Sequence, residues 1–348
     1  MRSRRPGYTA SVLDASPRCP AVPLLPFPRG PVSDHVVRAL HGPPRRLGPL
    51  PAAEDDPLWG DDSALALYVL YEQHYRGFEG VDDRWEWDPG LLAVRARLEE
   101  RFEARLGEEV PRRPVAPAGV AAELVRLADG GGGPSLSATC RDDGTLEQMR
   151  ELAVHRSAYQ LKEADPHTWA IPRLRGTAKA ALIEIQMDEY GRGEVARMHS
   201  ELFATTMRAL DLDDTYGAYL DRIPGTTLAT VNLVSLFGLH RRWRGALVGH
   251  LAYFEMCSVT PMSNYAAALR RLGVEAEGVE FYLEHVRADA GHELVALDRM
   301  AGGFVDDEPA LAADVVFGAA VLDALERAFA SQVMGAWGAG RSSLRPPA

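Results

Sequence analysis

The sequence predicts an all-α fold, in which a bundle of about seven core helices carries a smaller helical region at its N-terminal side. The first observation is periodicity: from residue 145 onward, apolar residues recur at helical spacing, and no segment shows the convincing alternation of a half-buried strand. The second is composition. With 348 residues, 46% hydrophobic and 25% charged, the chain resembles a soluble globular protein of one large or two ordinary domains.

The N-terminal part divides into a proline-rich stretch and a helical region. Of the 24 prolines, 12 fall before Leu58, and residues 1–57 show no sustained period, so we expect a tail or wrapping arm that adds little to the core. Residues 58–144 are predicted to be the helical N-terminal region. Asp61, Asp62 and Ser63 offer caps for a helix over 64–75, and Asp88 before Pro89 opens another over 90–107.

The segments between these helices are predicted from their residue types. The sequence GFEGVDDRWEW (77–87) suggests an ordered loop, PRRPVAP (111–117) a linker, residues 118–128 a short helix, and DGGGGPS (129–135) a flexible break.

The main helical domain is predicted over residues 145–336, with a tail at 337–348. Thr145 and Gln148 form a capping box that opens its first helix. Breaks fall at 191–193, 223–225, 260–264 and 302–303, and no internal repeat is visible. Helices are expected at 145–165, 174–190, 194–210, 226–238, 245–257, 263–272, 278–301 and 308–336.

Charge and cysteine content restrict the class of protein. The net charge of −11 argues against a nucleic-acid partner, and no apolar run approaches the ~20 residues that cross a bilayer, so we expect no membrane partner. The basic residues 1–5 are not followed by the apolar segment of a signal peptide, which predicts a cytoplasmic protein. Cys19, Cys140 and Cys257 lie far apart, without a CxxC motif, and are expected to be unpaired thiols.

The predicted helix 278–301 carries two imidazoles and a carboxylate on its core-facing side. His285, Asp289 and His292 are spaced by four and three residues, so at about 100° per residue they lie within roughly 60° of one another. Burying them unpaired would cost several kcal/mol. A first-row divalent metal would relieve this cost, because it accepts neutral imidazole and carboxylate ligands. The metal-free alternatives are a buried, hydrogen-bonded His–Asp cluster and a helix face that is exposed to solvent.

Other predicted helices carry polar groups where their period calls for apolar residues. Glu189 and Glu255 each end an apolar stripe, and His199 lies among apolar residues of helix 194–210. Glu163 ends a weaker stripe, which is interrupted by Arg156. Each alone could be a solvated helix end or a satisfied core side chain. The residues that we expect to be surface charges or non-ligand histidines are Glu184, Asp188, Glu194, His74, His155, His167, His240 and His250.

Taken together, the candidates form one set of four carboxylates and three imidazoles. Four carboxylates balance two divalent ions, and an oxygen-rich set without thiolate suits iron or manganese better than structural zinc. Glu189 and His199 would lie about 15 Å apart along an unbroken helix, so the break at 191–193, or assignment to different ions, is needed. The ferritin-like pattern of two Glu-x-x-His pairs is absent from the sequence. The candidate metal ligands are Glu163, Glu189, His199, Glu255, His285, Asp289 and His292.

The order and spacing of these residues resemble those of the heme-oxygenase-like diiron oxidases, also known as the iron-containing redox enzyme family. The resemblance covers residues 145–336 and rests on QMDEYGRGEVARMHSELF, YFEM and HVRADAGH. The sequence is similar in detail to the N-oxygenating branch, which has a histidine four residues before the bridging aspartate, as His285 stands before Asp289. The resemblance does not extend to residues 1–144 or to the substrate pocket.

The resemblance implies a seven-helix heme-oxygenase-like scaffold that binds two Fe(II) ions and uses O2 as co-substrate to oxidise a small organic molecule. Substrates of such enzymes include amino acids or their guanidine groups, which are N-oxygenated, and fatty or amino acids, which undergo C–C cleavage. It also implies two main ligand groups, with Glu255 bridging: Glu163, His199 and His292 for one iron, and Glu189, His285 and Asp289 for the other.

The function predicted on this basis is a non-heme diiron oxygenase or oxidase of small-molecule biosynthesis. Arg156, one turn before Glu163, could meet a substrate carboxylate or support a metal ligand. An external electron donor or reductase and a second copy in a homodimer are candidate partners. Two alternatives stay open: an iron-binding carrier or sensor without oxygenase turnover, and a metal-free relative such as a thiamin-degrading or quinone-cofactor-forming enzyme, which would have no reason to keep seven ligands.

Overall fold

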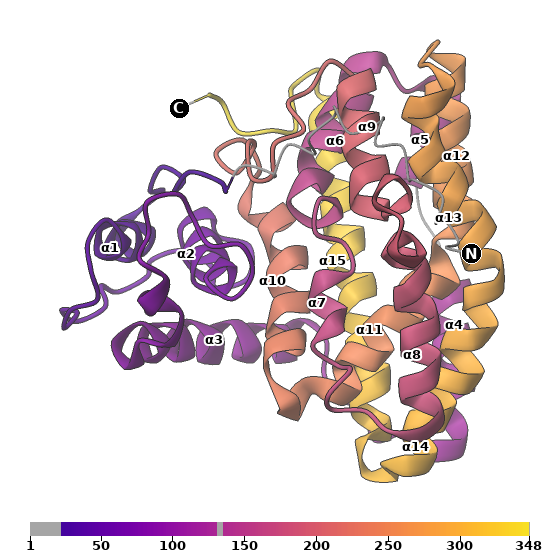
Figure 1. The fold of residues 1–348 in the computed structure, drawn as a ribbon, viewed down its shortest axis with the longest axis horizontal. Coiled ribbons are helices and arrows are strands. Elements are labelled where there is room, and N and C mark those ends of the chain that lie inside the picture. Colours follow the sequence, from indigo (N-terminus) through magenta and orange to yellow (C-terminus); the bar gives the residue numbers. More distant parts are fainter. Residues whose placement is uncertain (1–21, 131–134, 348) are drawn as a thin grey trace, which may run out of the picture.

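A computed structural model of the chain describes residues 22–130 and 135–347, and helices are the regular secondary structure found within these ranges. Most helices from α4 to α15 stand side by side in one bundle, while α2 packs against α10 and α1 lies on the far side of α2 (Figure 1). This confirms the predicted all-α fold. Residues 1–5, Cys19 and most of the predicted break at 129–135 lie outside the described residues. None of the described helices is both long and apolar enough to span a membrane.

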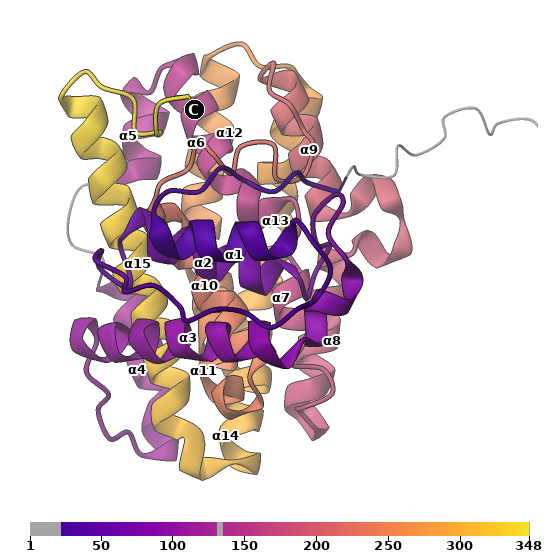
Figure 2. The same cartoon turned by 90° about the vertical axis from the view of Figure 1, so that its left-hand side faces the viewer.

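The N-terminal region contributes to the core from residue 32 onward. It contains α1 (Pro31–Leu40), α2 (Asp61–Glu72), the 3-10 turn η1 (Asp83–Trp87) and α3 (Pro89–Glu109), which runs across the bundle helices (Figure 2). Val32, Val36 and Leu40 are spaced by four residues on one face of α1, are 0% exposed and belong to the main core. The expectation that residues before 58 add little to the core is therefore wrong for α1, whose three-turn stripe is hidden in a proline-rich context.

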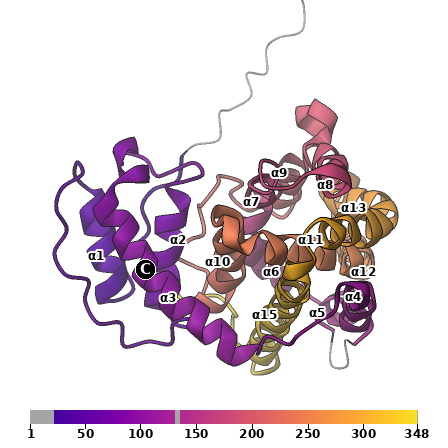
Figure 3. The same cartoon turned by 90° about the horizontal axis from the view of Figure 1, so that it is seen from below.

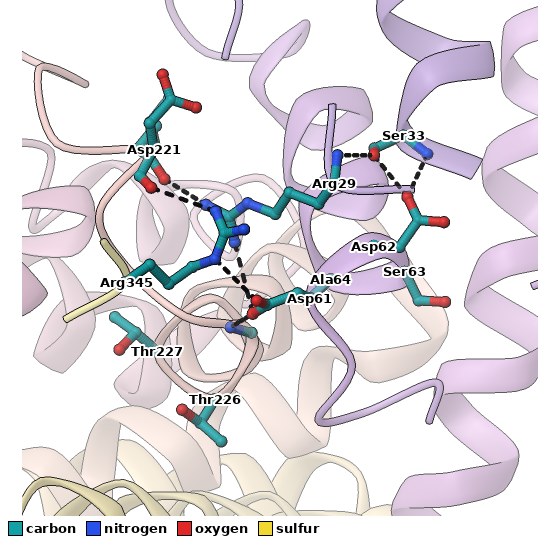
Figure 4. Close-up of polar contacts among 12 residues, drawn as sticks. Arg29, Ser33, Asp61, Asp62, Ser63, Ala64, Asp221, Thr226, Thr227 and Arg345 are labelled. Atoms are coloured by element: carbon teal, nitrogen blue, oxygen red, sulfur yellow. Dashed lines mark hydrogen bonds and ion pairs between the residues drawn. The ribbon is translucent and has the colours of Figure 1, made fainter. Parts of the chain in front are cut away.

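Asp88 caps α3 as predicted, by accepting from the backbone N–H of Leu91 at 2.9 Å, but the cap of α2 differs from the prediction. Helix α2 begins at Asp61, and the Asp55 carboxylate accepts hydrogen bonds from the backbone N–H groups of Asp62 and Ser63 at 2.9 and 3.0 Å. The Asp62 carboxylate instead accepts from the N–H groups of Val32 and Ser33 at the start of α1 (Figure 4). Asp62 thus satisfies the free N–H groups of a neighbouring helix and fastens α1 to α2.

The bundle is built from helices that mostly match the predicted ones. Its shorter elements are η2 (Pro117–Gly119), α7 (Asp165–Thr168), η3 (Gly191–Gly193), η4 (Val195–Arg197), η5 (Arg241–Trp243), α14 (Gly303–Asp307) and η7 (Pro309–Leu311). Its longer helices are α4 (Val120–Asp129), α5 (Leu136–Asp143), α6 (Leu146–Gln160), α8 (Gly176–Glu189), α9 (His199–Ala209), α10 (Gly225–Leu239), α11 (Arg244–Cys257), α12 (Val259–Arg271), α13 (Ala276–Leu294) and α15 (Ala312–Gly338), with the π-helical segment η6 (Val295–Gly302) directly after α13.

Helix α11 lies inside the bundle, in contact with α10, α13 and α15, as the view along the helices shows (Figure 3). Its close approach to α15 depends on two glycines. A Cβ atom at Gly249 would lie 1.8 Å from the carbonyl oxygen of Val315, and one at Gly318 would lie 2.0 Å from that of Ala246. Any side chain at either position would push the two backbones apart.

Three predicted boundaries in the bundle are corrected. The predicted break at 260–264 lies inside α12, because Pro261 occupies the first turn of the helix, where its missing N–H would have no partner in any case. Helix α6 ends at Gln160, so the predicted helix 145–165 is too long and Glu163 lies in a turn. Helix α9 begins at His199, after two 3-10 turns where the sequence predicted helix from residue 194.

The two ends of the described chain meet on the same side of the molecule. Arg345 Nε lies 2.8 Å from Asp61 Oδ2, and Arg29 NH1 lies 3.8 Å from Asp61 Oδ1 (Figure 4). The backbone N–H of Phe27 donates to Asp221 Oδ1 at 2.9 Å, and Arg345 donates to the carbonyl oxygen of the same residue at 3.3 Å. The start of the described chain and its C-terminal segment are thereby held to α2 and to the loop before α10.

Candidate metal centre

The seven candidate ligands predicted from the sequence lie together in the interior of the bundle, in two groups. Within each group, one ligand-type atom from every residue lies within 4.8 Å of the others. Members of both groups line one small cavity of about 40 Å³. The four-residue cluster contains Glu163, Glu189, His199 and His285, and the three-residue cluster contains Glu255, Asp289 and His292.

Helix α13 supplies residues to both clusters. His285 joins the four-residue cluster, whereas Asp289 and His292 belong to the three-residue cluster. At a rise of 1.5 Å per residue, His292 lies about 10 Å beyond His285 along the helix, so the two imidazoles cannot both reach the same place. The resemblance implied the same separation of the two histidines but the opposite assignment. The structure places His285, and not His292, with Glu163 and His199, and it places Asp289 with His292. Glu255 lies within the three-residue cluster.

A chain reversal between α8 and α9 brings Glu189 and His199 together. Glu189 is the last residue of α8, His199 is the first of α9, and the residues between them turn back through η3 and η4. The reversal uses positive φ angles at Gly191, Arg192 and Gly193, and a Cβ atom at Gly191 would lie 2.6 Å from the backbone of Met198. As a result, His199 Nδ1 lies 3.0 Å from Glu189 Oε2. The break at 191–193 therefore brings together two residues that an unbroken helix would hold about 15 Å apart.

His285 is oriented by its own helix. Its Nδ1 lies 2.8 Å from the carbonyl oxygen of Phe281, to which it donates, so Nε2 faces Glu163 Oε1 at 3.4 Å. This is the usual arrangement of a metal-binding histidine, in which one nitrogen donates to a carbonyl and the other is left for the metal. Without metal, burial lowers the pKa of His285, but the nearby carboxylates, Glu163 first, outweigh burial and raise the pKa to about 10.

The three-residue cluster surrounds Nδ1 of His292. This nitrogen lies 3.4 Å from Glu255 Oε2 and 3.7 Å from Asp289 Oδ1. Burial raises the pKa of Glu255 to about 7, and the Asp289 carboxylate adds to the effect. The hydroxyl of Ser258 donates to the other oxygen of Asp289. The cluster thus holds two carboxylates against one imidazole in a region from which water is largely excluded.

Asp188 is a part of the site that the sequence did not predict. Its Oδ2 lies 3.0 Å from Nε2 of His292, and its Oδ1 accepts from Arg192 at 2.5 Å. Burial alone would raise the pKa of Asp188, but these two partners lower it, so the carboxylate is ionised and can only accept. Asp188 lies off the apolar stripe of α8, and its proximity in sequence to Glu189 was the one available signal.

The donor atoms of the two clusters fit divalent metal ions. Six buried atoms of the cluster residues make no hydrogen bond of good geometry within the described part of the chain, and five of them face one another at 3.0–3.7 Å: Glu163 Oε2, Glu189 Oε2, His199 Nδ1, Glu255 Oε2, Asp289 Oδ1 and His292 Nδ1. Buried polar atoms without partners are costly, and all six are atom types that bind iron. Each cluster also contains two carboxylates, the number that balances one divalent ion.

The five histidines predicted to be non-ligands have partners outside the clusters. His155 contacts Thr227 and Ser343 at 2.7 and 3.0 Å, and His167 Nε2 lies 3.0 Å from Nδ1 of His250. His74 and His240 pair with Glu86 and Glu99 of other elements. The histidines predicted to be non-ligands therefore lie outside both clusters.

A second, larger cavity of about 350 Å³ adjoins the metal cavity. Tyr159, Phe254, Ser258 and Met262 line both cavities, and the rings of Tyr159 and Phe254 are stacked with centroids 5.7 Å apart. Aromatic rings of α9, α12 and α13 cover much of its remaining wall. The metal cavity and this chamber are therefore separated by a few side chains.

Paired charges line the chamber away from the metal cavity. Arg156 donates both terminal nitrogens to the two oxygens of Glu326, at 2.8 and 2.6 Å. Asp323 accepts hydrogen bonds from Arg327 and Tyr253, at 2.9 and 2.7 Å. Arg156 is thus paired with a chamber residue and with no member of the metal clusters. The four charged groups balance one another.

Comparison with known proteins identifies one matching family. The sequence model of the iron-containing redox enzymes matches residues 150–327, which is just over half of the chain and includes all seven cluster residues. No curated protein matches the sequence.

Proposed function

The chain belongs to the iron-containing redox enzyme family, as its sequence predicted, and from this premise we propose that it is an O2-dependent non-heme diiron oxidoreductase. The observation that carries the proposal is the pair of clusters, in which six buried ligand-type atoms lie without a hydrogen bond of good geometry. One Fe(II) in each cluster would satisfy these atoms and balance two carboxylates. Iron bound there would supply the electrons and the binding position for O2.

The protein side chains would hold the two ions and control the protons around them. Glu163, Glu189, His199 and His285 would hold one ion, and Glu255, Asp289 and His292 the other. Asp188 would keep a proton on Nε2 of His292, which leaves Nδ1 free for the metal. The Ser258 hydroxyl, which donates to Asp289 and faces both cavities, would orient that carboxylate.

The chamber beside the metal cavity supports an enzyme that acts on a small organic molecule. The chamber volume of about 350 Å³ suits an amino-acid-like or fatty-acid-like compound. The reacting end of the substrate would lie against Phe254, Ser258 and Met262, which line both cavities. N-oxygenation and oxidative C–C cleavage are the reactions proposed, with electrons from an external donor. A carrier or sensor that only binds iron has no need of such a chamber, and this favours turnover over the alternative.

The paired charges favour an amino-acid-like substrate. If the carboxylate of a fatty acid bound Arg156 in place of Glu326, the Glu326 carboxylate would be ionised and unpaired. An unpaired charge is costly in a half-buried position. A zwitterion can replace both partners, since its carboxylate can bind Arg156 and its ammonium group can bind Glu326. The aromatic wall would then contact the side chain of the substrate.

Anaerobic titration with Fe(II), followed by exposure to O2, tests the proposal. We expect saturation at two irons per chain, a transient visible absorption band after O2 is added, and faster decay of the band with a substrate amino acid. Saturation at one iron would overturn the dinuclear centre. Two bound irons without an absorption band or O2 consumption would favour the carrier or sensor.

A further inference from the structure

Glu163 is the one member of the two clusters that lies outside a helix. Helix α6 ends at Gln160 and α7 begins at Asp165, so residues 161–164 form a turn. The other six cluster residues belong to α8, α9, α11 or α13, whose backbone hydrogen bonds fix the direction of each side chain. Backbone hydrogen bonds tie the turn to the flanking helices, from the Lys162 N–H to the Tyr159 carbonyl and from the Asp165 N–H to the Lys162 carbonyl, each at 2.9 Å. These bonds do not involve Glu163, so the position of its carboxylate also depends on contacts with other elements.

These contacts come mainly from the end of α2 and the residues just after it. The ammonium group of Lys162 lies 2.8 Å from Glu72 Oε2, and the two side chains are 1% and 0% exposed. Arg76 donates to the carbonyl oxygen of Leu161 at 3.1 Å. On the opposite side, Gln186 of α8 donates to the carbonyl oxygen of Ala164 at 3.4 Å. Both residues before Glu163 and the one after it are therefore held.

The ion pair is enclosed by aromatic rings. The Lys162 ammonium lies 4.0 Å from the ring centroid of Tyr75 and 5.1 Å from that of Tyr68. Tyr216 donates its hydroxyl to Glu72 Oε2 at 2.7 Å. Two buried charges are rarely the most stable way to fill a core, and an apolar pair of similar volume is often at least as stable. What the ion pair adds is a fixed geometry between α2 and the residue next to Glu163.

We propose that Glu72 and Arg76 are positioning residues of the metal centre, which hold the turn 161–164 so that the Glu163 carboxylate faces His285 and Glu189. Both residues lie outside the range 150–327 that matches the family. The helical N-terminal region thus has a role in metal binding although it supplies no ligand. This inference rests on the proposed function, because it requires that the four-residue cluster binds a metal ion.

The test is the double variant Glu72→Met with Lys162→Met, which replaces the ion pair by two apolar side chains of similar volume. Binding of Co(II) is measured anaerobically by equilibrium dialysis, and folding by thermal unfolding of the metal-free protein. We expect the double variant to fold, to bind one Co(II) as wild type does, and to bind the other 10–100-fold more weakly, the usual effect of losing a residue that supports a ligand.

Two further measurements separate positioning from packing. If the ion pair acts through Glu163, adding the double substitution to Glu163→Gln weakens Co(II) binding no further, because the two changes affect the same contact. The matched control is Arg95→Met with Glu99→Met, a buried ion pair in α3 that contacts neither cluster. The control variant should bind both ions as wild type does.

The outcomes are distinct. If the double variant binds both Co(II) ions with wild-type affinity, or if its effect adds fully to that of Glu163→Gln, the positioning role is wrong. If the double variant does not fold, Arg76→Gln decides, since it removes the bond to Leu161 and the contact with the Tyr216 ring but keeps the ion pair. Weaker binding of one ion supports the proposal, and unchanged binding overturns it. If wild type itself binds fewer than two ions, the proposed dinuclear function fails first.

Discussion

Asp188 accepts a hydrogen bond from Nε2 of His292 at 3.0 Å, and this contact decides that Nδ1 faces Glu255 and Asp289. The carboxylate has only acceptor atoms when ionised, so the proton must be on the histidine nitrogen that it contacts. The orientation of a buried candidate ligand is thus set by a residue that is itself 21% exposed.

Changing Asp188→Asn should weaken metal binding at the three-residue cluster by about 10–100-fold, because the amide no longer holds the ring and its proton as firmly. Co(II) titration of the variant measures the change. The control is Glu184→Gln, on the same helix, whose side chain pairs with Arg299 at the surface and should leave both affinities unchanged. Equal affinities in Asp188→Asn and wild type would mean that the His292 contact is incidental.

Changing Asp289→Ala should remove one ion from the three-residue cluster, which would keep one carboxylate instead of two. Without metal, the variant should unfold at no lower temperature than wild type, since it relieves repulsion between Asp289 and the buried Glu255. Added Co(II) should raise the unfolding temperature of wild type more than that of the variant. A variant that is much less stable without metal, yet binds two ions, would show that Asp289 is a structural hydrogen-bonding residue.

The metal-free protein should lose stability as the pH rises. Burial lowers the pKa of His285, but the carboxylates around it raise the pKa to about 10, well above the value of about 6.5 in an unfolded chain. A raised pKa means that the protonated histidine stabilises the fold fully below pH ~6.5 and that this contribution disappears as the pH rises through about 10.

Denaturant unfolding of metal-free wild type and of His285→Gln, each between pH 6.5 and pH 10, measures this contribution. We expect the difference in free energy of unfolding between the two proteins to shrink across the range. Co(II) affinity should rise with pH over the same interval, because the metal displaces the proton from the imidazole. A constant difference between the two proteins would show that His285 is neutral in the folded state.

Removing residues 1–57 should destabilise the protein, since the deletion includes α1. Each of Val32, Val36 and Leu40 is fully buried, and losing such a contact costs about 1.5–3 kcal/mol per side chain. Thermal unfolding measures the loss, and a truncation that begins at residue 22 is the control that keeps α1. The fraction that remains folded should still bind Co(II), because the deleted region contains no cluster residue; loss of binding by folded protein would contradict this.

The parts of the site that could be predicted are those that local spacing encodes. His285, Asp289 and His292 lie on one face of α13 because steps of four and three residues follow the helical period, and Glu189 and Glu255 end apolar stripes for the same reason. Periodicity reports which face of a helix is buried, so it identified the polar residues that interrupt such a face.

The parts that could not be predicted depend on contacts between distant segments. Nothing near Lys162 in the sequence indicates that Glu72, ninety residues earlier, neutralises it in the core. Asp62 caps a helix other than its own, and Asp188 gains its role only because α8 lies beside the end of α13. The short stripe of α1 was hidden because a three-turn helix among prolines gives too few repeats for its period to be recognised.

The packing of α2 on α10, next to the pairing of Arg345 with Asp61, means that the N-terminal region is bound to the bundle by more than the chain connection between them. Residues 111–116 form a largely exposed connection without helix between α3 and the bundle. A protease that cleaved there would not release the N-terminal fragment. Helix α2 packs on α10, and Arg345 of the C-terminal segment forms an ion pair with Asp61 of α2. The cleaved protein would be a complex of two fragments that dissociates in denaturant. Glu72 of the N-terminal fragment would still form its ion pair with Lys162 of the other fragment.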